Sequence, residues 1–236
     1  MKIQYFDSLA ELSRESVRII LEQIHARENL LLCTATGNSP TQTYRNLEAE
    51  KITFNAGKLR IVKLDEWGGV QQDAPGTCER YLREQVLVPL GVEQDNYFSF
   101  RADASDPEAE CRRMNNVLDK EGPIDLCILG IGANGHIGFN EPDAYLEPRC
   151  HIAKLSEESK KHSMAKGMNP VPAYGLTLGV SDILQSKKIL IIITGTNKKT
   201  ALARLLEQKV STDIPASMLW LHPDVHCMID RNACPD

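Results

Sequence analysis

The sequence predicts an α/β fold with a mainly parallel sheet and helices on both faces. Short runs typical of buried strands alternate with segments of helical periodicity, and this alternation implies right-handed crossovers. Of the 236 residues, 42% are hydrophobic and 25% are charged, which is ordinary for a globular protein. No linker, low-complexity tract or internal repeat divides the chain, so we expect a single domain over residues 1–236.

The first half of the chain carries four helix starts. Ser8 and Glu11 have capping-box spacing before apolar positions at helical spacing. Ser39 is expected to cap the next helix, with Pro40 in its first turn. Two further caps are Thr77, for a helix to about residue 86, and Asp106, for a helix to about residue 120. The expected strands are 2–6, 30–33, 59–64 and 97–100.

The second half continues the alternation. We expect strands over 124–129, 189–194 and 225–229, and a helix over 198–208. In such folds ligands bind beyond the carboxyl ends of the strands. The loops that directly follow strands are therefore the candidate functional segments.

Composition excludes several classes of function. The net charge is −5, which gives no support for a nucleic-acid surface. No apolar run approaches the roughly 18–20 residues of a membrane span, and the N-terminus does not resemble a signal peptide. The seven cysteines include no CxxC pair, so we expect neither a metal site nor a disulfide framework, and a cytoplasmic location.

Two post-strand loops are candidates for anion binding. The loop 34–40 runs from a strand into a helix start and contains Thr36, Gly37, Asn38 and Ser39. Glycine and small hydroxyl residues allow backbone N–H groups to face an anion, and the helix dipole adds attraction. The loop 193–199 places lysines in a first helical turn, against the dipole, and a bound phosphate would explain them. A plain capped helix and a solvated charge pair are the alternatives.

Two other post-strand loops carry acid and base groups. Asp65 and Glu66 end a strand before a flexible loop, where one carboxylate can act as a general base; a turn cap is the alternative. The loop 130–142 contains GxGxxG, but Gly138 and Pro142 interrupt the helix that a dinucleotide site needs. It is expected instead to present three polar side chains, with the histidine as an oriented acid/base: Asn134, His136 and Glu141.

Together these motifs resemble the hexosamine-6-phosphate deaminase/isomerase family. The segments are TGNSP at 36–40, LDEW at 64–67, GIGANGHIGFNEP at 130–142 and TGTNKK at 194–199. The resemblance implies a Rossmann-like fold shared with 6-phosphogluconolactonases. It also implies cofactor-free conversion of an amino-sugar phosphate to a ketose phosphate plus ammonia. LDEW followed by PGTCE is most similar to galactosamine-6-phosphate enzymes, since glucosamine-type members usually have MDEY.

The resemblance also implies roles for individual residues. His136 resembles the acid/base that opens the sugar ring, with Glu141 orienting it and Asn134 beside it. Asp65 resembles the base that moves the proton at C2. The phosphate-binding positions are those of Thr36, Gly37, Asn38, Ser39 and Lys198.

One segment departs from the glucosamine-type pattern. Those enzymes have a phosphate-binding arginine in the segment that matches 155–168, whereas this chain offers His162 and Lys166 there. The departure favours galactosamine 6-phosphate. The expected partner is a small sugar phosphate, without metal, nucleic acid or membrane, and a homo-oligomer stays open. The competing functions are a 6-phosphogluconolactonase, whose loop usually has DGHTASLFP, and a non-catalytic sugar-phosphate sensor.

Overall fold

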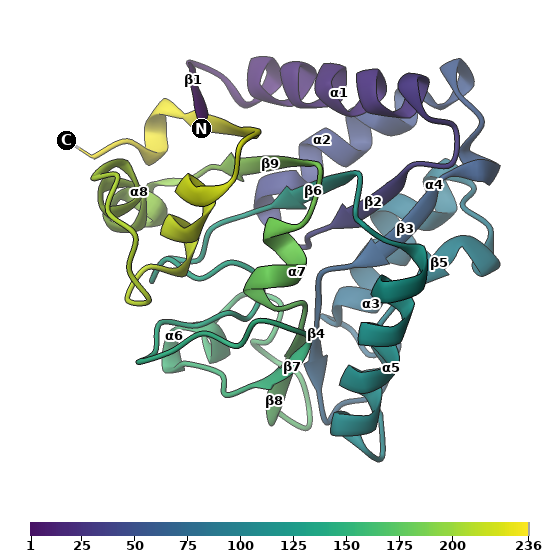
Figure 1. The fold of residues 1–236 in the computed structure, drawn as a ribbon, viewed down its shortest axis with the longest axis vertical. Helices are drawn as coiled ribbons and strands as arrows, with labels where there is room; N and C mark the ends of the chain where they lie inside the picture. Colours follow the sequence, from purple (N-terminus) through teal and green to yellow (C-terminus); the bar gives the residue numbers. More distant parts are fainter. Residues whose placement is uncertain (236) are drawn as a thin grey trace.

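A seven-stranded parallel sheet forms the centre of the molecule (Figure 1). The computed structural model describes residues 1–235. The strand order is β1-β10-β9-β6-β2-β3-β5, and every neighbouring pair is parallel. The predicted α/β class is confirmed. The strands are β1 (Lys2–Phe6), β2 (Leu31–Thr34), β3 (Arg60–Lys63), β5 (Tyr97–Phe98), β6 (Leu126–Leu129), β9 (Lys188–Ile193) and β10 (Val225–Asp230).

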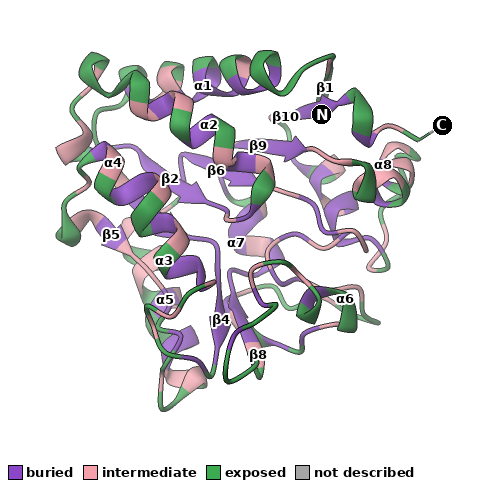
Figure 2. Ribbon diagram, turned by 180° about the vertical axis from the view of Figure 1, so that it is seen from behind, coloured by how far each residue is buried: buried purple, intermediate pink, exposed green. Residues whose placement is uncertain are grey.

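Helices cover both faces of this sheet. Side chains alternate along β2, so Leu31 and Cys33 enter one core while Leu32 enters the other. The Leu32 face is covered by α1 (Leu9–Ala26), α2 (Asn38–Ala49), α3 (Cys78–Leu82), a π-helical turn (Arg83–Leu87) and α4 (Val88–Leu90). The other is covered by α5 (Pro107–Glu121), α7 (Val180–Leu184), α8 (Lys199–Leu206) and the 3₁₀ segment Pro215–Leu221. Figure 2 shows the buried strands between helices that are exposed on their outer sides.

The predicted helix caps are confirmed at three positions and wrong at one. Ser8, Thr77 and Asp106 each accept a backbone N–H of the first helical turn. Ser39 does not cap α2, because Gly37 occupies the N-cap position and Ser39 lies inside the first turn. Gly37 has φ of +97°, a conformation that favours glycine.

A second, antiparallel sheet was not predicted. Its order is β4-β8-β7, formed by β4 (Asp65–Gly68), β8 (Tyr174–Thr177) and β7 (His151–Ala153), and α6 (Glu157–Lys160) lies beside it. The prediction that Asp65 and Glu66 enter a flexible loop is therefore wrong. After β3 the chain leaves the large sheet, and both acids lie in β4, where Asp65 is paired in register with Thr177.

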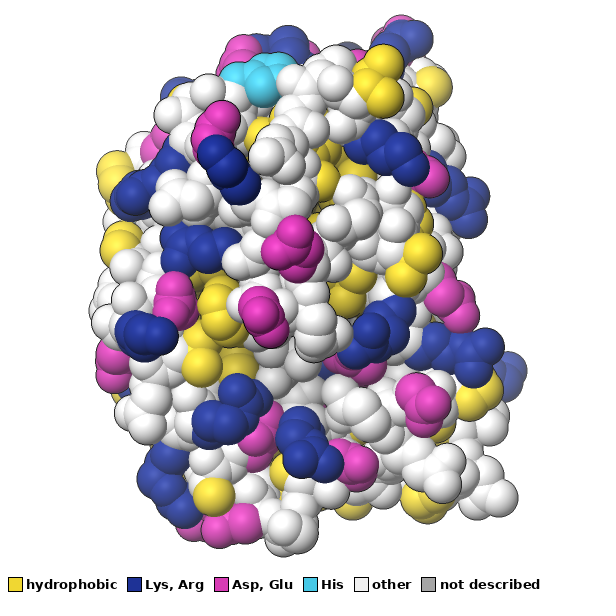
Figure 3. Space-filling model, turned by 90° about the vertical axis from the view of Figure 1, so that its right-hand side faces the viewer, with side chains coloured by type: hydrophobic (Ala, Val, Ile, Leu, Met, Phe, Trp, Pro, Cys, Tyr) yellow, Lys and Arg dark blue, Asp and Glu magenta, His cyan; other side chains and the backbone are white. Residues whose placement is uncertain are grey.

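The surface carries side chains of both charges. The face in Figure 3 intersperses Lys and Arg with Asp and Glu side chains. Within residues 1–235, no helix has both the length and the apolar character needed to cross a membrane.

Candidate active site

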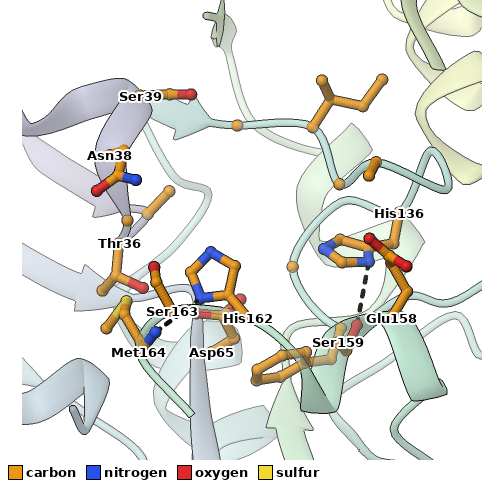
Figure 4. Close-up of a pocket in the computed structure, with 18 of the residues that line it drawn as sticks. Thr36, Asn38, Ser39, Asp65, His136, Glu158, Ser159, His162, Ser163 and Met164 are labelled. Carbon is orange, nitrogen blue, oxygen red and sulfur yellow. Dashed lines mark hydrogen bonds between the residues drawn. The ribbon is translucent and has the colours of Figure 1, made fainter. Parts of the chain in front are cut away.

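One cavity of about 450 Å³ lies where the predicted loops converge (Figure 4). Loops after β2, β6 and β9 contribute to its wall, together with the passage from β3 into β4, and the segment 158–164 closes it from the side of the small sheet. The structure thus brings the segments after four parallel strands together, as expected for a parallel sheet. The predicted site residues that line this cavity are Thr36, Gly37, Asn38, Ser39, Asp65, His136 and Lys198.

Two uncapped helix starts face this cavity. Neither α2, after Gly37, nor the 3₁₀ turn Thr196–Lys198, after Gly195, has a side chain capping its N–H groups. Both glycines have positive φ, +97° and +91°, which turns the chain sharply out of a strand. The Ser39 and Thr194 hydroxyls lie 3.0 Å apart and join the two loops. Free N–H groups at helix starts attract anions, so this end of the cavity suits a phosphate.

Lys198 supplies a cation at the same end. Burial lowers the pKa of its ammonium, and the charge of Glu158 opposes that shift. In the described part of the chain, no carboxylate lies within 4.0 Å of Lys198 to form an ion pair. A half-buried ammonium without a counter-ion favours binding of an anion.

Asp65 is a poorly solvated carboxyl group in the cavity wall. It is 8% exposed, and Cys78 Sγ lies 3.7 Å from its Oδ1 as a weak donor. Burial, followed by the charge of neighbouring Glu66, raises the pKa of Asp65 to about 7, while His136 opposes the rise. A carboxyl group that titrates near neutrality can accept and return a proton at low cost.

Glu66, the next residue, points to the opposite side of β4. Its side chain is fully buried and accepts from the backbone N–H groups of Trp67, Cys78 and Glu79 at 2.7–2.9 Å. Lys63 Nζ donates to Glu66 at 2.7 Å and to Glu79 at 3.0 Å. Burial alone would lower the pKa of Lys63, but the two carboxylates outweigh it and raise that pKa. Glu66 therefore anchors the small sheet and does not enter the cavity.

His136 is held by backbone and carboxylate together. Gly132 allows the imidazole to lie on the main chain, because a Cβ at this position would come within 2.5 Å of the ring. The ring nitrogen Nδ1 lies 3.3 Å from Glu141 Oε2 and 3.4 Å from Ser159 Oγ. No hydrogen bond within residues 1–235 uses Nε2, which leaves this nitrogen for a ligand.

Glu141 and Asn134 lie behind the imidazole and do not line the cavity. Asn134 Nδ2 donates to Glu141 Oε2 at 2.7 Å, and its Oδ1 accepts from the His136 backbone N–H at 3.2 Å. Burial would raise the pKa of Glu141, but His136, Ser159 and Asn134 outweigh it and lower that pKa to about 2. An ionised Glu141 fixes the orientation of the ring, as in other carboxylate–histidine pairs.

The segment without arginine contributes differently from the prediction. Lys166 is exposed and does not line the cavity, whereas Lys161 and His162 do. The lining of the cavity by this segment ends at Met164, and a turn in which the His162 carbonyl accepts the Lys166 N–H leaves Lys166 outside it. Burial, followed by the charge of Lys198, lowers the pKa of His162. In Figure 4 the His162 ring lies between Asp65, on β4, and Asn38, at the start of α2.

Comparison with known proteins decides the family. The model of the family described as glucosamine-6-phosphate isomerases/6-phosphogluconolactonase matches residues 6–227. This chain belongs to that family. It is 40% identical over 231 residues, 97% of the chain and 91% of its relative, to a candidate deaminase, AgaI, of Escherichia coli (strain K12). It is 37% identical to glucosamine-6-phosphate deaminase 1 of Bacillus subtilis (strain 168), covering 99% of the chain and 98% of that protein.

Solved structures of the family agree with the fold. A structure described as a monomeric glucosamine-6-phosphate deaminase of the NagB superfamily superimposes with a TM-score of 0.94 at 36% identity, covering 99% and 98% of the two chains. A 6-phosphogluconolactonase from Trypanosoma brucei superimposes with a TM-score of 0.75 at 23% identity, covering 98% and 97%. The second likeness concerns the fold alone.

Several lining residues of this family member had no motif to predict them. They come from the segment 158–164 and from the start of α3, which reach the cavity only through the small sheet. Glu157 and Glu158 are adjacent acids, as Asp65 and Glu66 are, but they follow a strand of the small sheet and not one of the predicted parallel strands. The residues are Cys78, Glu158, Ser159, Lys161, Ser163 and Met164, whereas His162 of the same segment was named from the sequence.

Proposed function

We propose that this protein converts a hexosamine 6-phosphate to a ketohexose 6-phosphate and ammonia. The observation that carries the proposal is the arrangement of one cavity. It combines an anion-binding end, a carboxyl group with a pKa of about 7 and a histidine backed by an ionised glutamate. An aldose–ketose isomerisation with deamination needs each of these groups.

His136 opens the ring in this proposal. A closed pyranose has no acidic proton at C2, so the O5–C1 bond must break first. Nε2 of the imidazole moves the proton from O1–H to O5, which leaves an aldehyde at C1. Glu141 holds Nδ1, so the ring keeps one orientation while Nε2 exchanges its proton. Asn134 orients Glu141 through the 2.7 Å hydrogen bond.

Asp65 then moves the proton from C2 to C1. The aldehyde acidifies C2–H, and the Asp65 carboxylate removes this proton while the C2 ammonium transfers one of its protons to O1, which gives a neutral enolamine. Return of the proton to C1 gives an imine at C2. Water adds to the imine carbon, and ammonia leaves. A base with a pKa of about 7 suits both the removal and the return.

The substrate phosphate lies against the two helix starts in this proposal. Backbone N–H groups of the Thr36–Ser39 segment, with Lys198, bind it, and Lys161 and His162 stand in place of the missing arginine. Binding the phosphate, remote from C1 and C2, supplies energy that orients the reacting carbons.

Galactosamine 6-phosphate is the preferred substrate in this proposal. Support comes from LDEW followed by PGTCE and from the absence of arginine in 155–168. The relatives whose names state a substrate are glucosamine-6-phosphate deaminases, so both epimers belong in the test. Self-association stays a prediction; the similar protein solved at 36% identity is described as monomeric.

Assay of ammonia release from both hexosamine 6-phosphates tests the function. We expect turnover of both, with a higher kcat/KM for the galactosamine epimer. Hydrolysis of 6-phosphogluconolactone without ammonia release would favour the lactonase. Tight binding of a sugar phosphate without turnover would favour a sensor.

A further inference from the structure

One acid in the cavity has no partner. Glu158 lies on α6, lines the cavity and is exposed. Across the described chain, no hydrogen bond or ion pair involves its carboxylate. Its charge acts within the cavity, since it opposes the lowering of the Lys198 pKa. In Figure 4 Glu158 is on the side of His136, and Asn38 and Ser39 are on the other.

The remaining carboxylates of the site are occupied. Glu141 Oε2 accepts from Asn134 and faces His136, while Oε1 accepts from Ser159 and from the Ser156 N–H. Asp65 must keep a high pKa to act as a base, and a cation paired with it would lower that pKa. Neither acid is therefore suited to hold a cationic group of a ligand.

The proposed substrate carries two opposite charges. Its phosphate is an anion, and its amino group at C2 is an ammonium near neutral pH. A cavity that binds both groups needs an acid as well as cations. We propose that Glu158 binds the C2 ammonium of the substrate and so selects amino-sugar phosphates over sugar phosphates with a hydroxyl at C2. This inference rests on the proposed function.

The neighbouring residue provides a matched control. Glu157 is also exposed on α6, but it pairs with Lys160 at 2.8 Å and does not line the cavity. Glu157→Gln and Glu158→Gln therefore remove the same charge from the same short helix. Only the second removes it from the cavity.

The test compares two ligands in the two variants. KM is measured for the turned-over hexosamine 6-phosphate, and Ki is measured for the 2-hydroxy analogue of the same epimer, galactose or glucose 6-phosphate. We expect Glu158→Gln to raise KM by about tenfold, the loss of one charge-assisted contact of about 1.4 kcal/mol at a partly solvated position. The Ki of the analogue should stay within about twofold, because its neutral hydroxyl lacks the charge. Glu157→Gln should change neither value.

Two results would overturn the role of Glu158. A parallel rise of KM and Ki would mean that the residue serves the whole ligand or the shape of α6. An unchanged KM would mean that the ammonium binds elsewhere. If the wild-type protein releases ammonia and either result is found, only this inference is contradicted. If the wild-type protein releases no ammonia, the proposed function itself is contradicted.

Discussion

The two sides of β4 show how neighbouring acids acquire different properties. Asp65 faces the cavity, and within residues 1–235 its one side-chain donor is the Cys78 thiol at 3.7 Å. Glu66 faces the protein and accepts four hydrogen bonds, one of them from Lys63. Side chains alternate along a strand, so one backbone step separates a reactive carboxyl group from a structural one. Burial raises the pKa of the acid that lacks donors, and the negative charge of its stabilised neighbour raises it further.

The largest expected effect on activity is that of Asp65→Asn. Loss of a general base typically lowers the rate by about 10²–10⁴-fold, so we expect ammonia release to fall to this extent. Binding of the sugar phosphate should persist, because the phosphate contacts lie at the other end of the cavity. Steady-state assays and calorimetric titration measure the two properties. Near-normal turnover would contradict the role of Asp65.

The same variant should be more stable than the wild type at neutral pH. The pKa of Asp65 rises from 3.8 to about 7 on folding, so the folded state binds more protons between these values. The wild type therefore loses stability as the pH rises from about 4 to 7, by at most about 4 kcal/mol, and the asparagine variant does not. Thermal unfolding at several pH values measures this difference. An identical pH dependence of the two proteins would contradict the raised pKa.

Glu66→Gln should lower the stability of the protein, and it should lower activity less than Asp65→Asn does. The amide group would face two of the four donors and leave Lys63 with one carboxylate, Glu79. Removal of one partner from a buried ion pair costs about 3–5 kcal/mol, which lowers Tm by roughly 6–20 °C in a chain of this size. The folded fraction should keep more activity than Asp65→Asn. A wild-type Tm with activity abolished would reverse the assignment of the two acids.

Lys198→Ala should have a smaller effect, confined to binding. Loss of a charge-assisted contact of about 1.5–3 kcal/mol raises KM by about 10–150-fold. Lys166→Ala is the control, since its exposed side chain does not line the cavity. Galactosamine without phosphate should be a very poor substrate of the wild type. Equal activity on the phosphorylated and unphosphorylated sugars would contradict the anion-binding end.

The smallest effect should be a shift of the acid limb of the pH profile. Asp65 must be ionised to act, so kcat/KM should rise through about pH 7. The hydrogen bond from Cys78 lowers the pKa of Asp65, and Cys78→Ala should move this limb to higher pH. Cys78→Ser keeps a donor and should restore the limb. A shift in the other direction would show that the thiol does not donate to Asp65.

The large sheet was predictable and the small one was not, for different physical reasons. The central strand β6, and β9 from Ile189 onward, are continuous apolar runs, which is the strongest pattern that a buried parallel strand produces. By contrast β7 has three residues, and β8 contains Gly175. A Cβ at Gly175 would come within 2.6 Å of the Phe139 ring, so packing and not propensity selects this strand.

The candidate site also has one part that was predictable from the sequence and one part that was not. Loops after parallel strands meet at one edge of the sheet, so Asp65, His136 and Lys198 could be predicted to converge. The choice between Lys161 and Lys166 depends on where a four-residue helix, α6, ends and the chain turns. Hydrogen bonds within the segment form that turn, among them the one from the Lys166 N–H to the His162 carbonyl, and none of the motifs found in the sequence marked it.

Solvent exchange tests the division of work between His136 and Asp65 most directly. In the reverse reaction the ketose 6-phosphate and ammonia are the substrates, so His136 does not have to open a pyranose ring. NMR in deuterated water then follows the C1 proton of the ketose. We expect His136→Gln to exchange this proton while closing slowly to product, and Asp65→Asn not to exchange it. Exchange by Asp65→Asn together with its absence in His136→Gln would contradict the account and reverse the two roles.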